Sequence, residues 1–275
     1  MTSSIRSNPL PFALCPLPFP WRALAIIGLL VAATACGDGS AEPPKPTAAA
    51  GKKVDAATAG SIAGMVKFEG TAPANAPIRI SKDCPQVAGA APVNEAVLVG
   101  KDGALRNVFV YVKSGLDAAY TFDTPTAPVE LVQSGCIYAP RVMGVRVGQP
   151  IDVVNSDPTL HNVHALPMVN QEFNKSQPVQ NSHMTHVFTA PEVMVRFMCN
   201  VHSWMSSYVG VMEHPYFAVS DEAGHFEIKN LPPGTYTLEA WHEKFGRKTA
   251  QVTVGDKQAQ TATFTFTADS KSESK

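Results

Sequence analysis

Residues 199–205 read CNVHSWM and bring a thiol, an imidazole and a thioether into one short segment, at intervals of three residues. The residues on either side, 193–198 and 208–213, have the composition and alternation of strands. CNVHSWM is therefore expected to be the loop that joins two strands. Side chains in a loop at the end of a sheet can converge on one site because rigid strands support them.

A second segment upstream supplies another imidazole. Residues 148–157, GQPIDVVNSD, read as a turn, a strand and a turn, so that His161 opens the next strand and Asn162 follows it. Two imidazoles and a thiolate, with a methionine sulfur as a weak axial contact, are the donor set of a copper electron-transfer site. Cysteine and histidine also bind zinc, and a strand end without any metal is the third interpretation.

The segments LHNVHAL (160–166) and CNVHSWM together resemble those of cupredoxins, the blue-copper family. In that family a ligand histidine in an HNV context follows an asparagine-rich turn, and Cys, His and Met share one loop near the end of the domain. The resemblance covers residues 125–215 and implies a Greek-key β-sandwich with a mononuclear copper site. The ligands that it implies are His161, Cys199, His202 and Met205. It also implies that Asn162 ties the two ligand loops together, as hydrogen bonds around metal ligands commonly do.

The same resemblance implies that the edge of His202 reaches an apolar patch where redox partners dock. Val201 and Trp204 are candidates for that patch, although Trp204 could equally be buried between domains. His164 lies three residues after His161 and so on the opposite face of the strand. It is expected to be a strand histidine, and it is the first substitute ligand if the site differs from the family pattern.

Methionine is concentrated in one part of the chain, with most of its residues between positions 143 and 212. We expect these methionines, apart from Met205, to fill gaps in a β core. A methionine-rich patch that binds Cu(I) is the alternative.

The flanking segments resemble a different module. Residues 217–255, which include SDEAGHF and LPPGTYTLEAW, resemble the carboxypeptidase regulatory-like domain, a small transthyretin-type β-sandwich. SIAGMVKFEG (61–70) and NVFVYVKSG (107–115) resemble the first strands of that module. The chain is therefore predicted to be all-β, with a second small sandwich built from residues 61–124 and 216–268. Modules of this kind are usually non-catalytic spacers or binding surfaces, and related sandwiches bind carbohydrate.

The N-terminus has the features of an export signal. The apolar run ALAIIGLLVAATA is too short for a comfortable membrane span and indicates a signal peptide over residues 1–35. The small residues before Cys36 resemble a bacterial lipoprotein processing site, so Cys36 is the expected lipid attachment point; ordinary cleavage nearby is the alternative. Residues 36–60 are predicted to be a flexible tether and residues 269–275 a disordered tail. The protein is thus expected in the periplasm or cell envelope, held to a membrane through its lipid.

The chain has five cysteines, of which Cys15 lies in the predicted signal peptide. Export implies an oxidising compartment, in which an unpaired thiol needs a reason to exist. The simplest assignment pairs Cys84 with Cys136 and leaves Cys199 for a metal. A disulfide between either of the first two and Cys199 is the alternative, and it would exclude the copper site.

We therefore expect an exported copper protein that carries single electrons to a redox partner protein. The 22 basic and 23 acidic residues are nearly balanced and give no indication of nucleic acid as a partner. No catalytic triad or pair of carboxylates at useful spacing is recognisable, which argues against an enzyme. A binuclear copper site would need a second cysteine in the loop 199–205, and the loop has only Cys199, so a binuclear site is excluded. The alternatives are a copper-binding or copper-delivery protein without redox turnover, and a carbohydrate- or cell-surface-binding sandwich.

Overall fold

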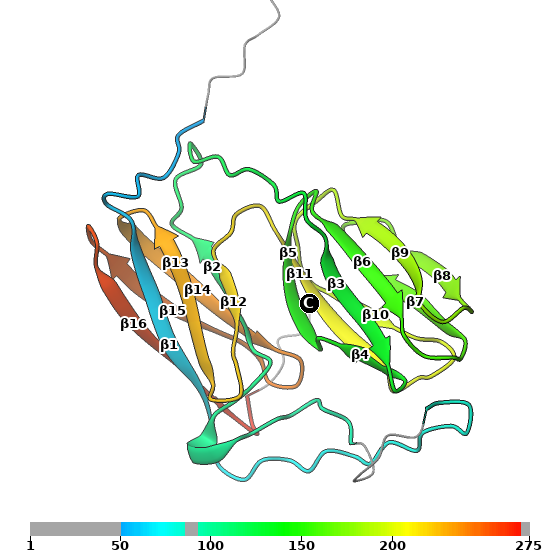
Figure 1. Cartoon of the computed structure of the whole chain (residues 1–275). Coiled ribbons are helices and arrows are strands. Elements are labelled where there is room, and N and C mark those ends of the chain that lie inside the picture. The colour runs from blue at the N-terminus through cyan, green and yellow to red at the C-terminus, as the bar shows by residue number, and fades with distance from the viewer. Residues whose placement is uncertain (1–50, 86–92, 271–275) are drawn as a thin grey trace, which may run out of the picture. The chain divides into compact units, whose positions relative to one another are not determined.

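The computed structural model describes residues 51–85 and 93–270, and strands dominate them. The chain separates into residues 1–48 and one compact unit, Ala49–Lys275, which contains all described residues. Within that unit the strands form four sheets, which pair into two β-sandwiches (Figure 1). The predicted all-β fold class, with two sandwiches, is confirmed.

The first sandwich is built from both ends of the described chain. Its three-stranded sheet has the order β13–β1–β16, with β1 at Gly60–Glu69, β13 at His225–Leu231 and β16 at Ala259–Thr267. Its four-stranded sheet has the order β12–β2–β14–β15, with β12 at Phe217–Val219, β2 at Phe109–Ser114, β14 at Gly234–His242 and β15 at Gly246–Val254. Alternate residues of these strands point inward and form one core, which includes Ile62, Val110, Leu238 and Phe264.

The second sandwich is continuous in sequence. Its five-stranded sheet has the order β5–β11–β10–β7–β8, with β5 at Val142–Arg146, β11 at Ser206–Met212, β10 at Glu192–Met198, β7 at His161–Leu166 and β8 at Phe173–Gln177. Its four-stranded sheet has the order β4–β3–β6–β9, with β4 at Ile137–Ala139, β3 at Val129–Ser134, β6 at Pro150–Asn155 and β9 at Ser182–Val187. The core between the sheets includes Leu131, Val153 and Phe197, and Cys199 and Met205 belong to the same cluster.

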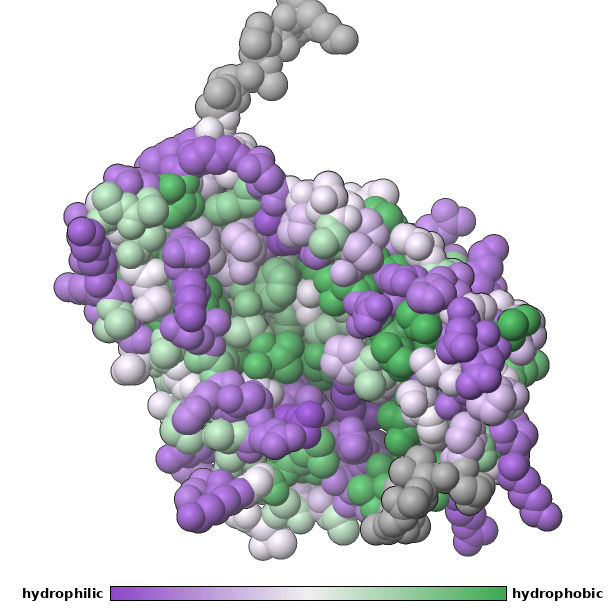
Figure 2. Space-filling model, viewed as in Figure 1, coloured by the Kyte–Doolittle hydropathy of each residue, from purple (hydrophilic) through white to green (hydrophobic). Residues whose placement is uncertain are grey.

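A third buried cluster joins the outer face of β2 to β5 and β11. Phe109 and Tyr111 from β2 meet Val142 from β5 and Met212 from β11. The aromatic ring of Phe109 packs against Gly210 of β11. A Cβ atom at Gly210 would lie 2.4 Å from Cζ of Phe109, so only glycine leaves room for the ring. The face shown in Figure 2 mixes hydrophobic and hydrophilic residues, as expected where strands turn alternate side chains to solvent.

The segment between β1 and β2 extends from the first sandwich to the second (cyan in Figure 1). A disulfide between Cys84 and Cys136 connects it there, with the two Cα atoms 5.8 Å apart. This is the pairing that the sequence favours, and Cys199 is a free, buried cysteine. Interpreting residues 61–124 as strands of the first sandwich alone is therefore incomplete, because part of this stretch is bonded to the second sandwich.

Residues 51–59 are held by backbone hydrogen bonds at Lys52 and Thr58. The backbone N–H of Lys52 donates to the carbonyl of Ala119 (2.8 Å), and the carbonyl of Lys52 accepts the N–H of Thr121 (2.9 Å). The prediction of a flexible tether over residues 36–60 is wrong for this part, because backbone pairing holds it.

Other predictions fall outside the described residues. These are the signal peptide, the lipid site Cys36 with the rest of the tether up to residue 50, and residues 271–275 of the tail. The described end of the tail is capped, since the N–H of Ser270 donates to the carbonyl of Thr267 (3.1 Å). Within residues 51–85 and 93–270, no helix is long and apolar enough to cross a membrane.

Candidate metal centre

The register of the five-stranded sheet explains why the two predicted segments meet. β10 and β11 are antiparallel, and their closing pair is Met198 with Ser206, so residues 199–205 form the connection between them. β7 lies on the other side of β10, with His164 opposite Met198. Because β7 and β10 are antiparallel, His161 lies further toward the connecting loop than His164.

Three of the four predicted ligands converge through their donor atoms. The Nδ1 atoms of His161 and His202 are 3.0 Å apart, and Cys199 Sγ is 3.9 Å from His202 Nδ1. All three side chains are buried, and their donor atoms lie within 4.8 Å of one another. Met205 is buried in the same cluster, and its N–H closes the loop by donating to the carbonyl of His202 (3.0 Å).

The sulfur of Cys199 is surrounded by backbone donors. The N–H of Asn162 points at Sγ from 3.5 Å, and the N–H of His202 points at it from 3.4 Å. Donors of this kind stabilise negative charge on an acceptor. The two N–H groups thus hold in place the sulfur atom through which a cysteine binds metal.

Each histidine carries a carboxylate on its outer nitrogen. His161 Nε2 is 2.9 Å from Asp157 Oδ2, and His202 Nε2 is 3.2 Å from Asp83 Oδ2. The pKa of Asp83 is held below its ordinary value by hydrogen bonds, first from Ser81 and its own backbone and then from His202. Burial lowers the pKa of His161, and the bond to Asp157 opposes that effect. Neither aspartate was identified from the sequence, although Asp157 lies four residues before one ligand and Asp83 adjoins a predicted disulfide cysteine.

These contacts decide which nitrogens face the centre. Asp157 accepts the N–H groups of Gly135 (2.7 Å) and Cys136 (2.8 Å), so its oxygens act as acceptors. These carboxylates favour the tautomer in which Nε2 of each histidine carries the hydrogen and donates it, while Nδ1 offers its lone pair. Two lone pairs facing each other at 3.0 Å repel, and either a proton or a metal ion between them removes that repulsion. The donor set of two imidazoles and a thiolate therefore fits a copper ion.

Asn162 connects the two ligand-bearing segments. Its Oδ1 accepts the N–H of Asn200 (2.5 Å) and its Nδ2 donates to Asn174 Oδ1. The side chain thus holds the start of β7 against the residue that follows Cys199. This is the contact that the resemblance implies for Asn162.

The surroundings of His202 differ from the expected exposed edge. Its side chain is only 2% exposed, because Asp83 and the Cys84–Cys136 disulfide cover Nε2. Trp204 is partly buried and donates its indole N–H to the carbonyl of Cys136 (2.8 Å). Of the expected docking patch, Val201 is exposed at 47%, whereas the His202 edge is not part of the surface.

The remaining histidines lie apart from the converging donor atoms. His164 bonds Glu172 (2.7 Å) and Asn200 (3.0 Å) on the outer face of β7. His183 bonds Asp152 at a distance of 2.7 Å. Among the described methionines, Met143, Met205 and Met212 are buried, whereas Met168 is 83% exposed.

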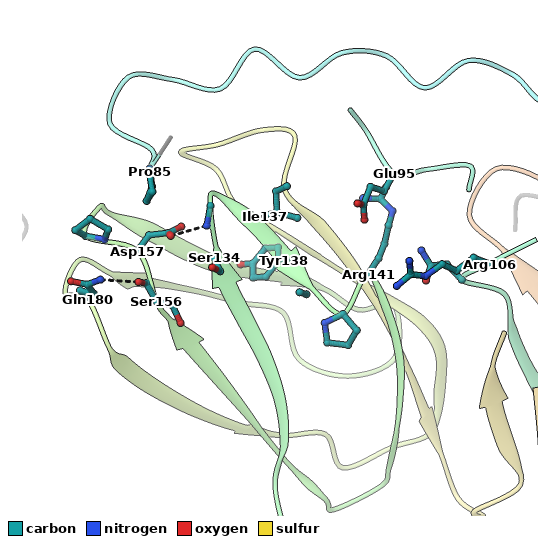
Figure 3. A pocket seen from close by; sticks show the side chains of 15 residues that line it. Pro85, Glu95, Arg106, Ser134, Ile137, Tyr138, Arg141, Ser156, Asp157 and Gln180 are labelled. Atoms are coloured by element: carbon teal, nitrogen blue, oxygen red, sulfur yellow. Dashed lines mark hydrogen bonds between the residues drawn. The ribbon is translucent and has the colours of Figure 1, made fainter. Parts of the chain in front are cut away.

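A cavity of about 670 Å³ has Asp157, the hydrogen-bond partner of His161, in its wall (Figure 3). Asp157, Ser134 and Tyr138 form part of its wall, and Figure 3 shows the hydrogen bond that holds Asp157 to the turn after Ser134. The Tyr138 hydroxyl donates to the carbonyl of Asn162 (2.8 Å). The wall of the cavity therefore supports residues of the site.

Comparisons with known proteins bear on both sandwiches. Residues 210–267 match the family model of the carboxypeptidase regulatory-like domain, which confirms the predicted resemblance of the C-terminal segment. The search of curated proteins returned no match. A copper-containing nitrite reductase from Thermus scotoductus SA-01 is similar over 37% of this chain and 26% of that chain, at 19% identity and a TM-score of 0.31.

Two smaller copper proteins are matched over nearly their whole length. A purple cupredoxin from Nitrosopumilus maritimus is similar over 30% of this chain and 99% of that chain, at 19% identity and a TM-score of 0.27. A mutant of amicyanin in the Cu(I) form is similar over 38% of this chain and 98% of that chain, at 20% identity and a TM-score of 0.29. The chain thus carries a segment similar to the carboxypeptidase regulatory-like domain, and its structural neighbours are cupredoxins.

Proposed function

We propose that this protein binds one copper ion through His161, Cys199, His202 and Met205 and works as a one-electron carrier. The observation that carries the proposal is the convergence of two Nδ1 lone pairs and one free cysteine sulfur, all buried and within 4.8 Å of one another. A copper ion held there supplies the Cu(II)/Cu(I) couple.

The residues around the ion suit electron transfer. Imidazole nitrogens bind copper in both oxidation states, while the sulfurs of Cys199 and Met205 favour Cu(I). The ligands are held by strand ends, by Asn162 and by the two aspartates, so they have little freedom to rearrange between oxidation states. Little rearrangement means a small barrier to electron transfer.

Visible absorption and EPR spectra of the purified protein loaded with Cu(II) test the proposal. We expect an intense thiolate-to-copper charge-transfer band that bleaches on reduction. Cys199→Ser should lose the band completely, because a hydroxyl does not replace a thiolate as a soft ligand. His183→Asn is the matched control, since His183 bonds Asp152 outside the site and its loss should leave the spectrum unchanged.

The alternatives give different results. A spectrum without a thiolate band, combined with tight binding of Zn²⁺, would indicate that the site binds zinc and not copper. Tight Cu(I) binding with rapid transfer to an acceptor and slow reduction of Cu(II) would indicate copper delivery. Binding of carbohydrate that copper removal does not affect would assign the activity to the first sandwich instead.

The proposal includes a location and a partner. Export through the signal peptide and a lipid on Cys36 would hold the protein at a bacterial membrane, in the periplasm or cell envelope. There it would exchange electrons with a redox partner protein, without enzymatic turnover of its own and without nucleic acid. Metabolic labelling with a fatty acid, lost in Cys36→Ala, tests the anchor.

A further inference from the structure

We propose that Asp83 is a positioning residue for His202 and that the Cys84–Cys136 disulfide holds it in place. This inference rests on the copper site proposed above and concerns what keeps that site closed. Asp83 comes from the segment between β1 and β2, far in sequence from every ligand. Its carboxylate oxygen lies 3.2 Å from His202 Nε2.

Two contacts fix Asp83 where it can act. Its Oδ2 accepts a hydrogen bond from the hydroxyl of Thr159 (3.1 Å), which is two residues before the ligand His161. The next residue, Cys84, is bonded to Cys136, whose sulfur is 3.9 Å from His202 Nε2. The disulfide therefore lies beside the same imidazole edge that Asp83 binds.

The turn at Gly135 and Cys136 connects both histidines to their carboxylates. Its two N–H groups hold Asp157, which binds the outer nitrogen of His161. Cys136 holds the segment that carries Asp83 through the disulfide. The carbonyl of Cys136 also accepts the indole N–H of Trp204. The ring centroids of Trp204 and His202 are 5.3 Å apart. One turn thus orders the outer partners of both imidazole ligands.

The chemistry of this arrangement has two consequences. A carboxylate that accepts the N–H of a ligand imidazole makes the other nitrogen a stronger electron donor, which stabilises Cu(II) relative to Cu(I). It also fixes the ring orientation, so His202 cannot swing away and release the ion. Loss of such a partner typically weakens metal binding by about 10- to 100-fold.

Asp83→Ala and Asp83→Asn test the role of the carboxylate. We expect the rate at which a chelator removes copper to rise about 10-fold or more in Asp83→Ala, with a smaller rise in Asp83→Asn. The reduction potential should rise in both variants, a change that a purely structural role would not cause. Asp152→Ala is the matched control, because Asp152 bonds a histidine outside the site, and it should change neither quantity.

The disulfide is tested by replacing both cysteines, Cys84→Ser with Cys136→Ser, which should speed copper removal as Asp83→Ala does. The proposal is overturned if the Asp83 variants release copper at the wild-type rate with an unchanged potential. A measurement on the metal-free protein distinguishes failure of the role of Asp83 from failure of the copper proposal. In the wild type, the Nε2 proton of His202 should give a slowly exchanging NMR signal. If Asp83→Ala leaves that signal unchanged, Asp83 does not position the imidazole, whether or not copper binds.

Discussion

At the scale of single residues, His242 illustrates how burial controls the charge of a histidine. It is 1% exposed, and its ring is stacked on that of Phe245, with centroids 4.6 Å apart. Burial, aided by the positive charges of Arg141 and Lys244, lowers its pKa from 6.5 to about 3. Between those values the histidine is protonated in the unfolded chain and neutral in the folded protein. Its contribution to stability is therefore present above about pH 6.5 and is lost as the pH falls toward 3.

His242→Asn should reduce this acid sensitivity. The asparagine is neutral at every pH. In the wild type the N–H of Lys244 donates to His242 Nδ1, and the side-chain oxygen of the asparagine can accept the same hydrogen bond. Between pH 7 and pH 5, His242 should account for a loss on the order of 2 kcal/mol in the free energy of unfolding. Urea unfolding at both pH values measures the difference. An equal loss in the wild type and the variant would show that His242 is not the titrating group.

The residue scale also shows where sequence reasoning succeeds and where it stops. The convergence of His161, Cys199 and His202 could be predicted because residue type and spacing are local properties of the chain. Asp83 could not, because its role depends on a disulfide that brings a distant segment to the site. The expectation of an exposed His202 edge was wrong for the same reason, since Asp83 and Cys84, which help to cover it, come from outside residues 125–215.

At the scale of elements, the pairing of β5 with β11 shows how close packing selects glycine. Gly144 and Gly210 are register partners on these parallel strands, and both face the ring of Phe109. A Cβ atom at Gly210 would lie 2.4 Å from the ring and 2.9 Å from Met194 Cε. The two strands can therefore approach β2 only because they lack side chains at this level.

Gly210→Ala should destabilise the protein by about 1–3 kcal/mol, because overpacking forces neighbours out of their preferred positions. Denaturant unfolding measures the cost. The matched background is Phe109→Leu, which removes the ring that the new methyl group would meet. The alanine should cost less in that background, with a coupling energy that a double-mutant cycle detects. Additive effects would rule out the ring as the cause.

Strands could be predicted better than the segments between them. The alternation of apolar residues indicates β10 and β11 directly, and the loop between them follows from their bounds. The long segment after β1 has no such periodicity, so its path to the second sandwich depends on tertiary contacts such as those of Asp83 and Cys84. The ordered residues 51–59 were missed because their backbone pairing leaves no hydrophobic pattern.

At the scale of the whole molecule, copper should act as a stabilising ligand. An ion that binds the folded protein but not the unfolded chain adds about 2.7 kcal/mol at 100 times its dissociation constant. For a protein of this size that corresponds to a rise in Tm of roughly 5–10 °C. Calorimetry with and without a copper chelator measures it. The same rise in Cys199→Ser would mean that the stabilising ion binds elsewhere.

The placement of β1 has a consequence for the order in which the chain can fold during synthesis. β1 lies in the middle of its sheet, and both of its neighbours, β13 and β16, come from beyond residue 224. From Ser61 opposite Ala259 to Glu69 opposite Thr267, the earliest strand runs parallel to the latest. The second sandwich, β3 to β11, can complete all its strand pairs before the partners of β1 have been synthesised. The second sandwich, with the cluster of His161, Cys199 and His202, can therefore form first, and the first sandwich is completed only after the last strand has been synthesised.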